Sequence, residues 1–170
     1  NTIPSRVYLT KEFWRHCENG DIVGVLNVIH RSGEKYSNYL VHALNEYGNN
    51  AIMYCCWGLS QDRQLLQLLL DFGVDPCVIN SEGSTPLHEC CIAGKIDMVE
   101  LLLSKDTVKS MIDYKDNLRR RRTPLVCAVG YGHVHIVRML LENGASIDDP
   151  SPLKIGCRYR QSHTVKALLE

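Results

Sequence analysis

Apolar and polar residues follow a helical period between residues 85 and 103, where the chain reads as two short helices. Thr85 suits an N-cap, because its side-chain oxygen can accept a free backbone N–H, and Pro86 suits the first helical position. Gly94 breaks the pattern and predicts a turn. The second helix places its apolar residues three to four positions apart, on one face: Ile96, Val99, Leu102 and Leu103.

The same pattern recurs along the chain. Clear copies occupy residues 123–141 and 151–169, and two degenerate copies occupy residues 13–29 and 50–70. Equivalent positions in the last four copies are separated by 33, 38 and 28 residues. A pair of short helices cannot bury its own apolar face, so neighbouring pairs must stack.

Two motifs resemble the ankyrin repeat, a unit of roughly 33 residues that carries Thr-Pro-Leu-His. They are Gly83-Ser84-Thr85-Pro86-Leu87-His88, and Gly132-His133 followed by Ile136-Val137. The resemblance implies an all-α ankyrin-repeat solenoid in which helix-turn-helix units are joined by hairpin loops. It predicts a single domain over residues 1–170 with about five units, the last one truncated: 10–44, 45–77, 78–113, 114–148 and 149–170. The first unit departs from the pattern, with Phe13-Trp14 where Leu-His would stand.

The composition is that of a globular protein. The 170 residues include 45% apolar residues, and 19 basic residues balance 19 acidic ones. The longest nearly unbroken apolar stretch, residues 51–59, is about half of a bilayer span, so no transmembrane segment is predicted. The first residues lack the layout of a secretory signal. We expect the chain to be part of a longer protein, with more repeats or another domain after residue 170.

The zero net charge hides an asymmetry. Residues 1–118 hold ten Lys or Arg against fifteen Asp or Glu, whereas residues 119–170 hold nine against four. The molecule should therefore have an acidic end and a basic end.

Eight cysteines occur without a CxxC pair, so zinc-ligand spacing is absent. Six of them fall where the ankyrin pattern has its pair of small residues, and a free cysteine behaves as a small apolar residue. We interpret these as reduced core residues, which favours the cytoplasm or the nucleus; a redox or metal role is the alternative. The six are Cys17, Cys55, Cys56, Cys90, Cys91 and Cys157.

No pattern indicates catalysis. The chain has no glycine-rich phosphate loop, nucleophile elbow or HExxH motif. The resemblance implies structural roles for His88, which would bond to neighbouring loops, and for His133. His133, His135 and Cys127 are not spaced to converge on a metal. We therefore predict no enzyme activity, no cofactor and no metal site.

The resemblance implies that a partner protein or peptide binds at the hairpin tips and at the two residues after each small pair, along a concave groove. An apolar and aromatic line is expected there, since Tyr, Trp and Arg anchor many interfaces. A single exposed aromatic residue would mean little. The candidates outside the basic run are Tyr47, Trp57, Glu82, Ile92, Tyr131, Arg158 and Tyr159.

The run Arg119, Arg120, Arg121 and Arg122 departs from the family pattern, since a Gly-x-Thr turn would stand there. Four adjacent guanidinium groups repel one another, so we expect them to contribute nothing to the stability of the fold unless a partner binds them. Arginine suits bidentate capture of carboxylate or phosphate. The run predicts a basic shelf for an acidic ligand at the C-terminal end; a solvated loop or a nuclear-import-like stretch is the alternative.

The sequence supports two functional hypotheses. The first is a non-catalytic protein–protein interaction module, an adaptor or scaffold. The second is a regulatory or substrate-docking domain of a larger enzyme or channel, in which the arginine run recognises an acidic peptide, a lipid headgroup or a nucleic acid. A weaker third hypothesis is self-assembly through the C-terminal face, and the oligomeric state stays open.

Overall fold

The computed structural model describes residues 6–58, 63–118, 121–148 and 152–170, and the described elements are all helical. The helices are α1 (Arg6–Asn19), α2 (Ile22–Val41), α3 (Ala51–Trp57), α4 (Arg63–Asp71), α5 (Pro86–Ala93), α6 (Ile96–Leu103), α7 (Asp106–Lys109), α8 (Pro124–Tyr131), α9 (Val134–Glu142), α10 (Pro152–Arg158) and α11 (Ser162–Leu169).

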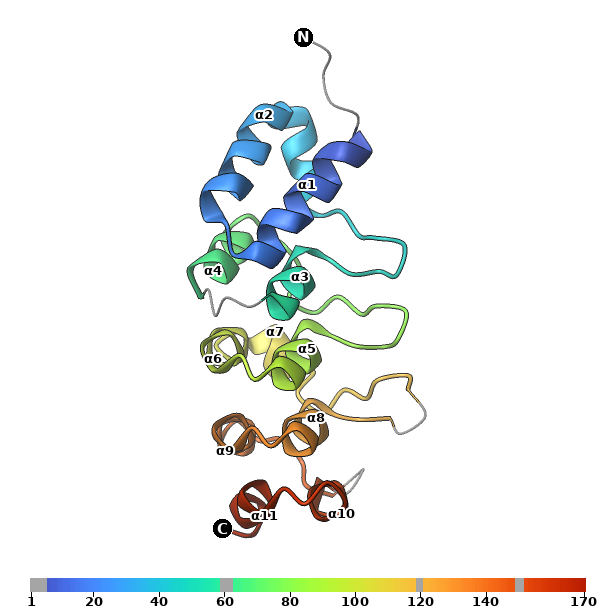
Figure 1. Ribbon diagram of the computed structural model, residues 1–170, viewed down its shortest axis with the longest axis vertical. Helices are drawn as coiled ribbons and strands as arrows, with labels where there is room; N and C mark the ends of the chain where they lie inside the picture. The colour runs from blue at the N-terminus through green and yellow to red at the C-terminus, as the bar shows by residue number, and fades with distance from the viewer. Residues whose placement is uncertain (1–5, 59–62, 119–120, 149–151) are drawn as a thin grey trace.

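The helices form pairs that stack along the long axis of the molecule, with the two termini at opposite ends (Figure 1). Helices α1, α3, α5, α8 and α10 pack one on the next as an inner row. An outer row of α2, α4, α6, α9 and α11 lies beside it (Figure 1). This arrangement confirms the predicted all-α solenoid of stacked helix pairs.

The inner helices begin where the sequence places their caps. The Thr85 side chain accepts the N–H of His88, and Thr123 accepts the N–H of Val126, with a proline following each threonine. Gly94 ends α5 at φ 73°, a left-handed conformation that favours glycine. A Cβ on Gly94 would also lie 2.6 Å from the His133 ring, so this position needs glycine for space as well.

Hairpins project from the inner row on one side of the stack (Figure 1). Three of them are closed in the same way, by an Asn or Asp whose backbone N–H donates across the hairpin and whose side chain accepts N–H groups of the turn. The closing pairs are Asn45 with Asn49, Asn80 with Ser84, and Asp116 with Arg122.

Successive hairpins are also bonded to each other. The Ser81 N–H donates to the Tyr47 carbonyl at 2.8 Å, and the Asn117 N–H donates to the Glu82 carbonyl at 2.8 Å. The hairpins therefore form a connected ladder beside the inner helices.

Two features of the helices were not predicted. Helix α2 has 20 residues and a kink at Gly33, where φ is 69°. Part of the extra length before the fourth helix pair forms α7, and the rest widens the hairpin between Asp116 and Arg122.

Five of the six cysteines at the small-residue position are buried as predicted, and Cys127 is buried as well. Burial raises the pKa of Cys127 to about 12 and that of Cys91 well above its ordinary value, so both thiols stay protonated and pack as apolar groups. The prediction is wrong for Cys157, which is exposed because α10 lies at the end of the described stack.

Candidate binding site

Two hollows lie where the hairpins meet the inner helices, and we call them together the groove. The Trp57 hollow, of about 330 Å³, is lined by Tyr47, Asn49, Trp57, Asn80, Ser81, Glu82 and Glu89. The Tyr131 hollow, of about 590 Å³, is lined by Leu118, Arg122, Val126, Cys127, Gly130, Tyr131, Ile155 and Tyr159.

Trp57 is held in place although 41% of it is exposed. Its Nε1 donates to Glu89 Oε2 at 2.8 Å, and its ring meets Tyr54 edge-on, with centroids 5.2 Å apart. Tyr54 in turn stacks on Trp14 at 5.2 Å. Because these contacts already hold the indole in place, it loses little conformational entropy when a ligand binds.

Tyr47 and Glu82 enter the same hollow from two hairpin tips. The backbone N–H of Tyr47 donates to Asn45 Oδ1 at 2.9 Å, and that of Glu82 donates to Asn80 Oδ1 at 3.0 Å. Their backbones are thus fixed, while the Tyr47 ring remains 59% exposed and the Glu82 side chain is also exposed.

Tyr131 is the last residue of α8 and is 55% exposed. Its ring is parallel to that of His133, with centroids 6.4 Å apart. His133 Nε2 donates to the Ile92 carbonyl at 3.1 Å, which bears out its predicted structural role. Tyr159 follows α10 and is 48% exposed. Both tyrosines line the larger hollow from neighbouring inner helices.

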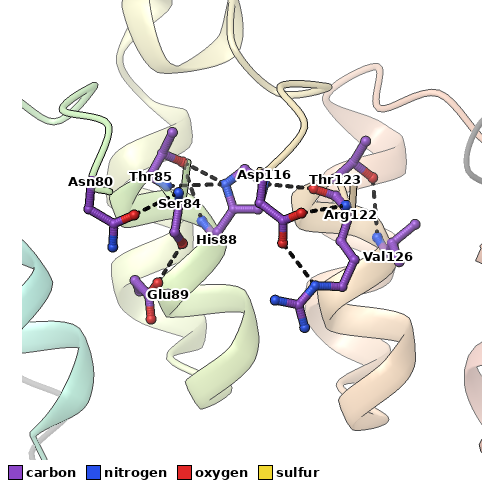
Figure 2. Close-up of polar contacts among 9 residues, drawn as sticks. All are labelled: Asn80, Ser84, Thr85, His88, Glu89, Asp116, Arg122, Thr123 and Val126. Carbon is purple, nitrogen blue, oxygen red and sulfur yellow. Dashed lines mark hydrogen bonds and ion pairs between the residues drawn. The ribbon is translucent and has the colours of Figure 1, made fainter. Parts of the chain in front are cut away.

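Arg122 is held by hydrogen bonds to another residue of the same hairpin (Figure 2). Asp116, which is only 1% exposed, accepts the Arg122 backbone N–H at 2.8 Å and its Nε at 2.9 Å. We expected the arginines to contribute nothing to the stability of the fold without a partner. That expectation is wrong for Arg122, because the wider hairpin places the buried Asp116 carboxylate within hydrogen-bond distance of it. The guanidinium still lines the Tyr131 hollow.

His88 joins the next hairpin to its own helix (Figure 2). Its Nδ1 accepts the Thr85 N–H, so its Nε2 carries the proton and donates to the Arg122 carbonyl at 3.0 Å. Burial lowers the pKa of His88 below its ordinary value, because the charged imidazolium would be poorly solvated there. The predicted structural role of His88 is confirmed.

The groove gathers six of the predicted site residues, although in two hollows rather than one continuous line. Tyr47, Trp57 and Glu82 share the first hollow, and Arg122, Tyr131 and Tyr159 share the second.

The other predicted residues stand apart from the hollows. Ile92 is half-buried and lines neither hollow, and neither does the exposed Arg158. Arg121 is exposed, at φ 46°. Arg119 and Arg120 lie outside the described residues.

The sequence reading missed Asn80, Glu89 and Asp116, which fix the groove. A signal was present for Asn80, because Asn45 and Asn80 stand at the same distance before the caps Asn50 and Thr85, whereas Asp116 stands two residues further from its cap, Thr123. Glu89 gave no such signal, since its partners are Trp57 of the previous helix pair and the Ser84 hydroxyl.

Within the described residues no group of three or more His, Cys, Asp or Glu could hold a metal ion. The described helices also include none that is long and apolar enough to span a bilayer.

Near the first helix pair, His16 contacts Asp21 at 2.8 Å, and the Glu12 carboxylate binds Arg31 at 3.0 Å.

A family model described as ankyrin repeats (3 copies) matches residues 14–113, 59–151 and 104–170, which together span most of the chain. The chain belongs to the ankyrin-repeat family. Repeats of this family indicate a protein-interaction module, and they are typically non-catalytic.

Three relatives illustrate the range of these ankyrin-repeat proteins. The chain is 31% identical over 113 residues to the human transient receptor potential cation channel subfamily A member 1, a match that covers 64% of the chain and 10% of the relative. It is 32% identical over 106 residues to the bovine SMC5-SMC6 complex localization factor protein 1, covering 62% and 10%. It is 32% identical over 137 residues to the ankyrin repeat protein nuc-2 of Neurospora crassa, covering 76% and 11%. The match thus spans about a tenth of each of these relatives.

Proposed function

We propose that this domain is a non-catalytic binding module that holds a segment of a partner protein in the groove. The observation that carries the proposal is the exposure of four aromatic side chains that line the two hollows: Tyr47 (59%), Trp57 (41%), Tyr131 (55%) and Tyr159 (48%). Such rings bury a large area on binding and keep a polar handle for orientation. One exposed ring needs no explanation, but four on one face favour an interface.

The ionisable groups around the hollows also support the fold: Glu89 is bonded to Trp57 and Ser84, and Asp116 is bonded to Arg122. The buried, protonated thiols also favour a reducing compartment, the cytoplasm or the nucleus.

The test is a selection of random phage-displayed dodecapeptides on the immobilised 170-residue chain. The double substitution Trp57→Ala and Tyr131→Ala should weaken a selected peptide by at least about 30-fold, or about 2 kcal/mol, because it removes one anchor from each hollow. Fluorescence polarisation of the labelled peptide measures this change. Equal affinity for the double variant and the wild type, or no enrichment at all, would reject the groove as the binding site.

A matched control is Tyr39→Ala. Tyr39 on α2 is 51% exposed, close to the exposure of Tyr131, but lines neither hollow. Its removal should leave the affinity for the selected peptide unchanged.

A second candidate is a regulatory domain of a larger protein, and the similarity to a cation channel subunit favours it. In that function the arginine run of residues 119–122 would bind an acidic peptide, a lipid headgroup or a nucleic acid. Such binding should weaken steeply when the salt concentration rises from about 50 to 200 mM. An affinity that does not change with salt would reject this second candidate.

A further inference from the structure

The two hollows carry opposite charges. Among the described residues that line the Trp57 hollow, two are carboxylates, Glu82 and Glu89, and none is Lys or Arg. The described lining of the Tyr131 hollow includes one cation, Arg122, and no Asp or Glu. Each hollow also holds two exposed aromatic side chains, so each combines a charge with an apolar wall.

The two carboxylates of the Trp57 hollow differ in their exposure and in the hydrogen bonds that hold them. Glu89 is half-buried and accepts hydrogen bonds from Trp57 and Ser84, which fix it in place. Glu82 is exposed at a hairpin tip whose backbone is anchored. A Lys or Arg side chain entering this hollow would meet the Glu82 carboxylate and could lie over the Trp57 or Tyr47 ring, an arrangement that favours cations.

The Tyr131 hollow has the complementary chemistry. Asp116 accepts the Nε–H of Arg122, and among the described residues no hydrogen bond joins the two terminal nitrogens of that guanidinium to another residue. A carboxylate from a ligand can therefore accept from those nitrogens while its neighbouring atoms contact Tyr131 and Tyr159.

The stacking of the inner helices sets the distance between the hollows. The Trp57 hollow lies at α3 and α5, the Tyr131 hollow lies at α8 and α10, and α5 packs against α8. Packed helices are about 8–10 Å apart, so two steps along the row separate the hollows by about 16–20 Å. An extended chain rises about 3.3 Å per residue and covers that distance in five or six residues.

We propose that the groove binds an extended peptide segment in which a Lys or Arg enters the Trp57 hollow and an Asp or Glu enters the Tyr131 hollow, five or six residues away. This inference rests on the proposed function, since it specifies what the groove accepts. The residues between the two charges pass Ile92, which is half-buried on α5, so an apolar or small residue fits there.

The test uses the dodecapeptide selection on the full chain. Enriched sequences should pair a basic and an acidic residue five or six positions apart, in a single chain order, at several times the frequency in the unselected library. Selection on a Glu82→Lys chain should replace the basic residue of that pair by an acidic one, because the exposed residue 82 is then positive while Glu89 stays bonded to Trp57 and Ser84.

A direct affinity measurement completes the test. Glu82→Lys should weaken a selected, fluorescein-labelled peptide by about fivefold, and changing the basic residue of that peptide to Glu should restore the affinity. Glu46→Lys is the matched control, because Glu46 is also exposed at a hairpin tip but lines neither hollow.

The outcomes separate this inference from the proposed function. If the Trp57→Ala and Tyr131→Ala variant loses the selected peptides but these show no charge spacing, or Glu82→Lys binds them as well as the wild type does, the charge pairing is wrong and the binding module stands. If no peptide is enriched, both proposals are overturned.

Discussion

Two neighbouring regions of the same repeats differ in how far their polar and aromatic side chains are buried. One is the buried joint between a hairpin and the inner helices, and the other is the open groove beside it. We call the joint the hairpin anchor: it consists of Thr85, His88, Asp116 and Arg122 (Figure 2). Its polar groups bond to one another, and Asp116 is only 1% exposed. In the groove, by contrast, Tyr47 and Tyr131 leave more than half of their area exposed.

This difference separates residues that make the fold from residues that are available to a partner, and Arg122 alone of the four anchor residues also lines a hollow. A buried polar group must be bonded, because an unsatisfied one costs free energy. Exposed rings gain little for folding, so their removal should cost little stability. Changes in the hairpin anchor should therefore alter the free energy of unfolding, whereas changes in the groove should alter binding.

The largest effect is expected for Asp116→Ala. The substitution leaves the backbone N–H and the guanidinium of Arg122 without their acceptor, and it should lower the free energy of unfolding by about 3 kcal/mol. Urea denaturation followed by circular dichroism measures the change. Asp116→Asn keeps an acceptor for the N–H and should cost less, while the exposed Asp97→Ala serves as a near-neutral control.

A smaller loss is expected for His88→Gln. The amide can replace only part of the bonding between Thr85 and the Arg122 carbonyl, and it fills the buried site less well. The expected cost is about 2 kcal/mol by the same denaturation assay. A free energy of unfolding equal to that of the wild type would remove His88 from the hairpin anchor.

Acid should weaken the wild type through the same histidine. The pKa of His88 is lowered in the folded state, so the unfolded chain binds the proton more readily. The contribution of neutral His88 is complete above its unfolded pKa of about 6.5 and is lost as the pH falls towards the lowered folded value. Urea denaturation at pH 7.5 and pH 5.5 should show this loss, and His88→Gln should show a smaller pH dependence.

The smallest effect on stability is expected for Tyr131→Ala. Tyr131 is 55% exposed and its ring stacks beside His133, so its loss should change the free energy of unfolding by about 0.5 kcal/mol or less. A loss as large as that of His88→Gln would show that Tyr131 belongs to the fold, and the contrast between the two regions would fail.

The sequence was sufficient for the parts of the fold that depend on local residues. Thr85 and Thr123 cap the helices that follow them, and Gly94 ends its helix, because capping and left-handed turns are decided within a few residues.

The groove was predicted less completely, because its polar contacts join residues far apart in the chain. The hydrogen bond from Trp57 on α3 to Glu89 on α5 joins two neighbouring helix pairs, and no spacing in the sequence indicates it. The pairing of Arg122 with Asp116 depends on how far the third hairpin widens. The resemblance to ankyrin repeats indicated the face on which Trp57 and Tyr131 lie, but not the division of that face into two hollows.

The most direct test of the groove is hydroxyl-radical footprinting of the 170-residue chain with and without a selected dodecapeptide. We predict that the peptide reduces labelling of Tyr47, Trp57, Tyr131 and Tyr159, while the equally exposed Tyr39 is labelled as before. Protection of Tyr39 in place of the four groove residues, or unchanged labelling of those four with the peptide bound, would contradict the account.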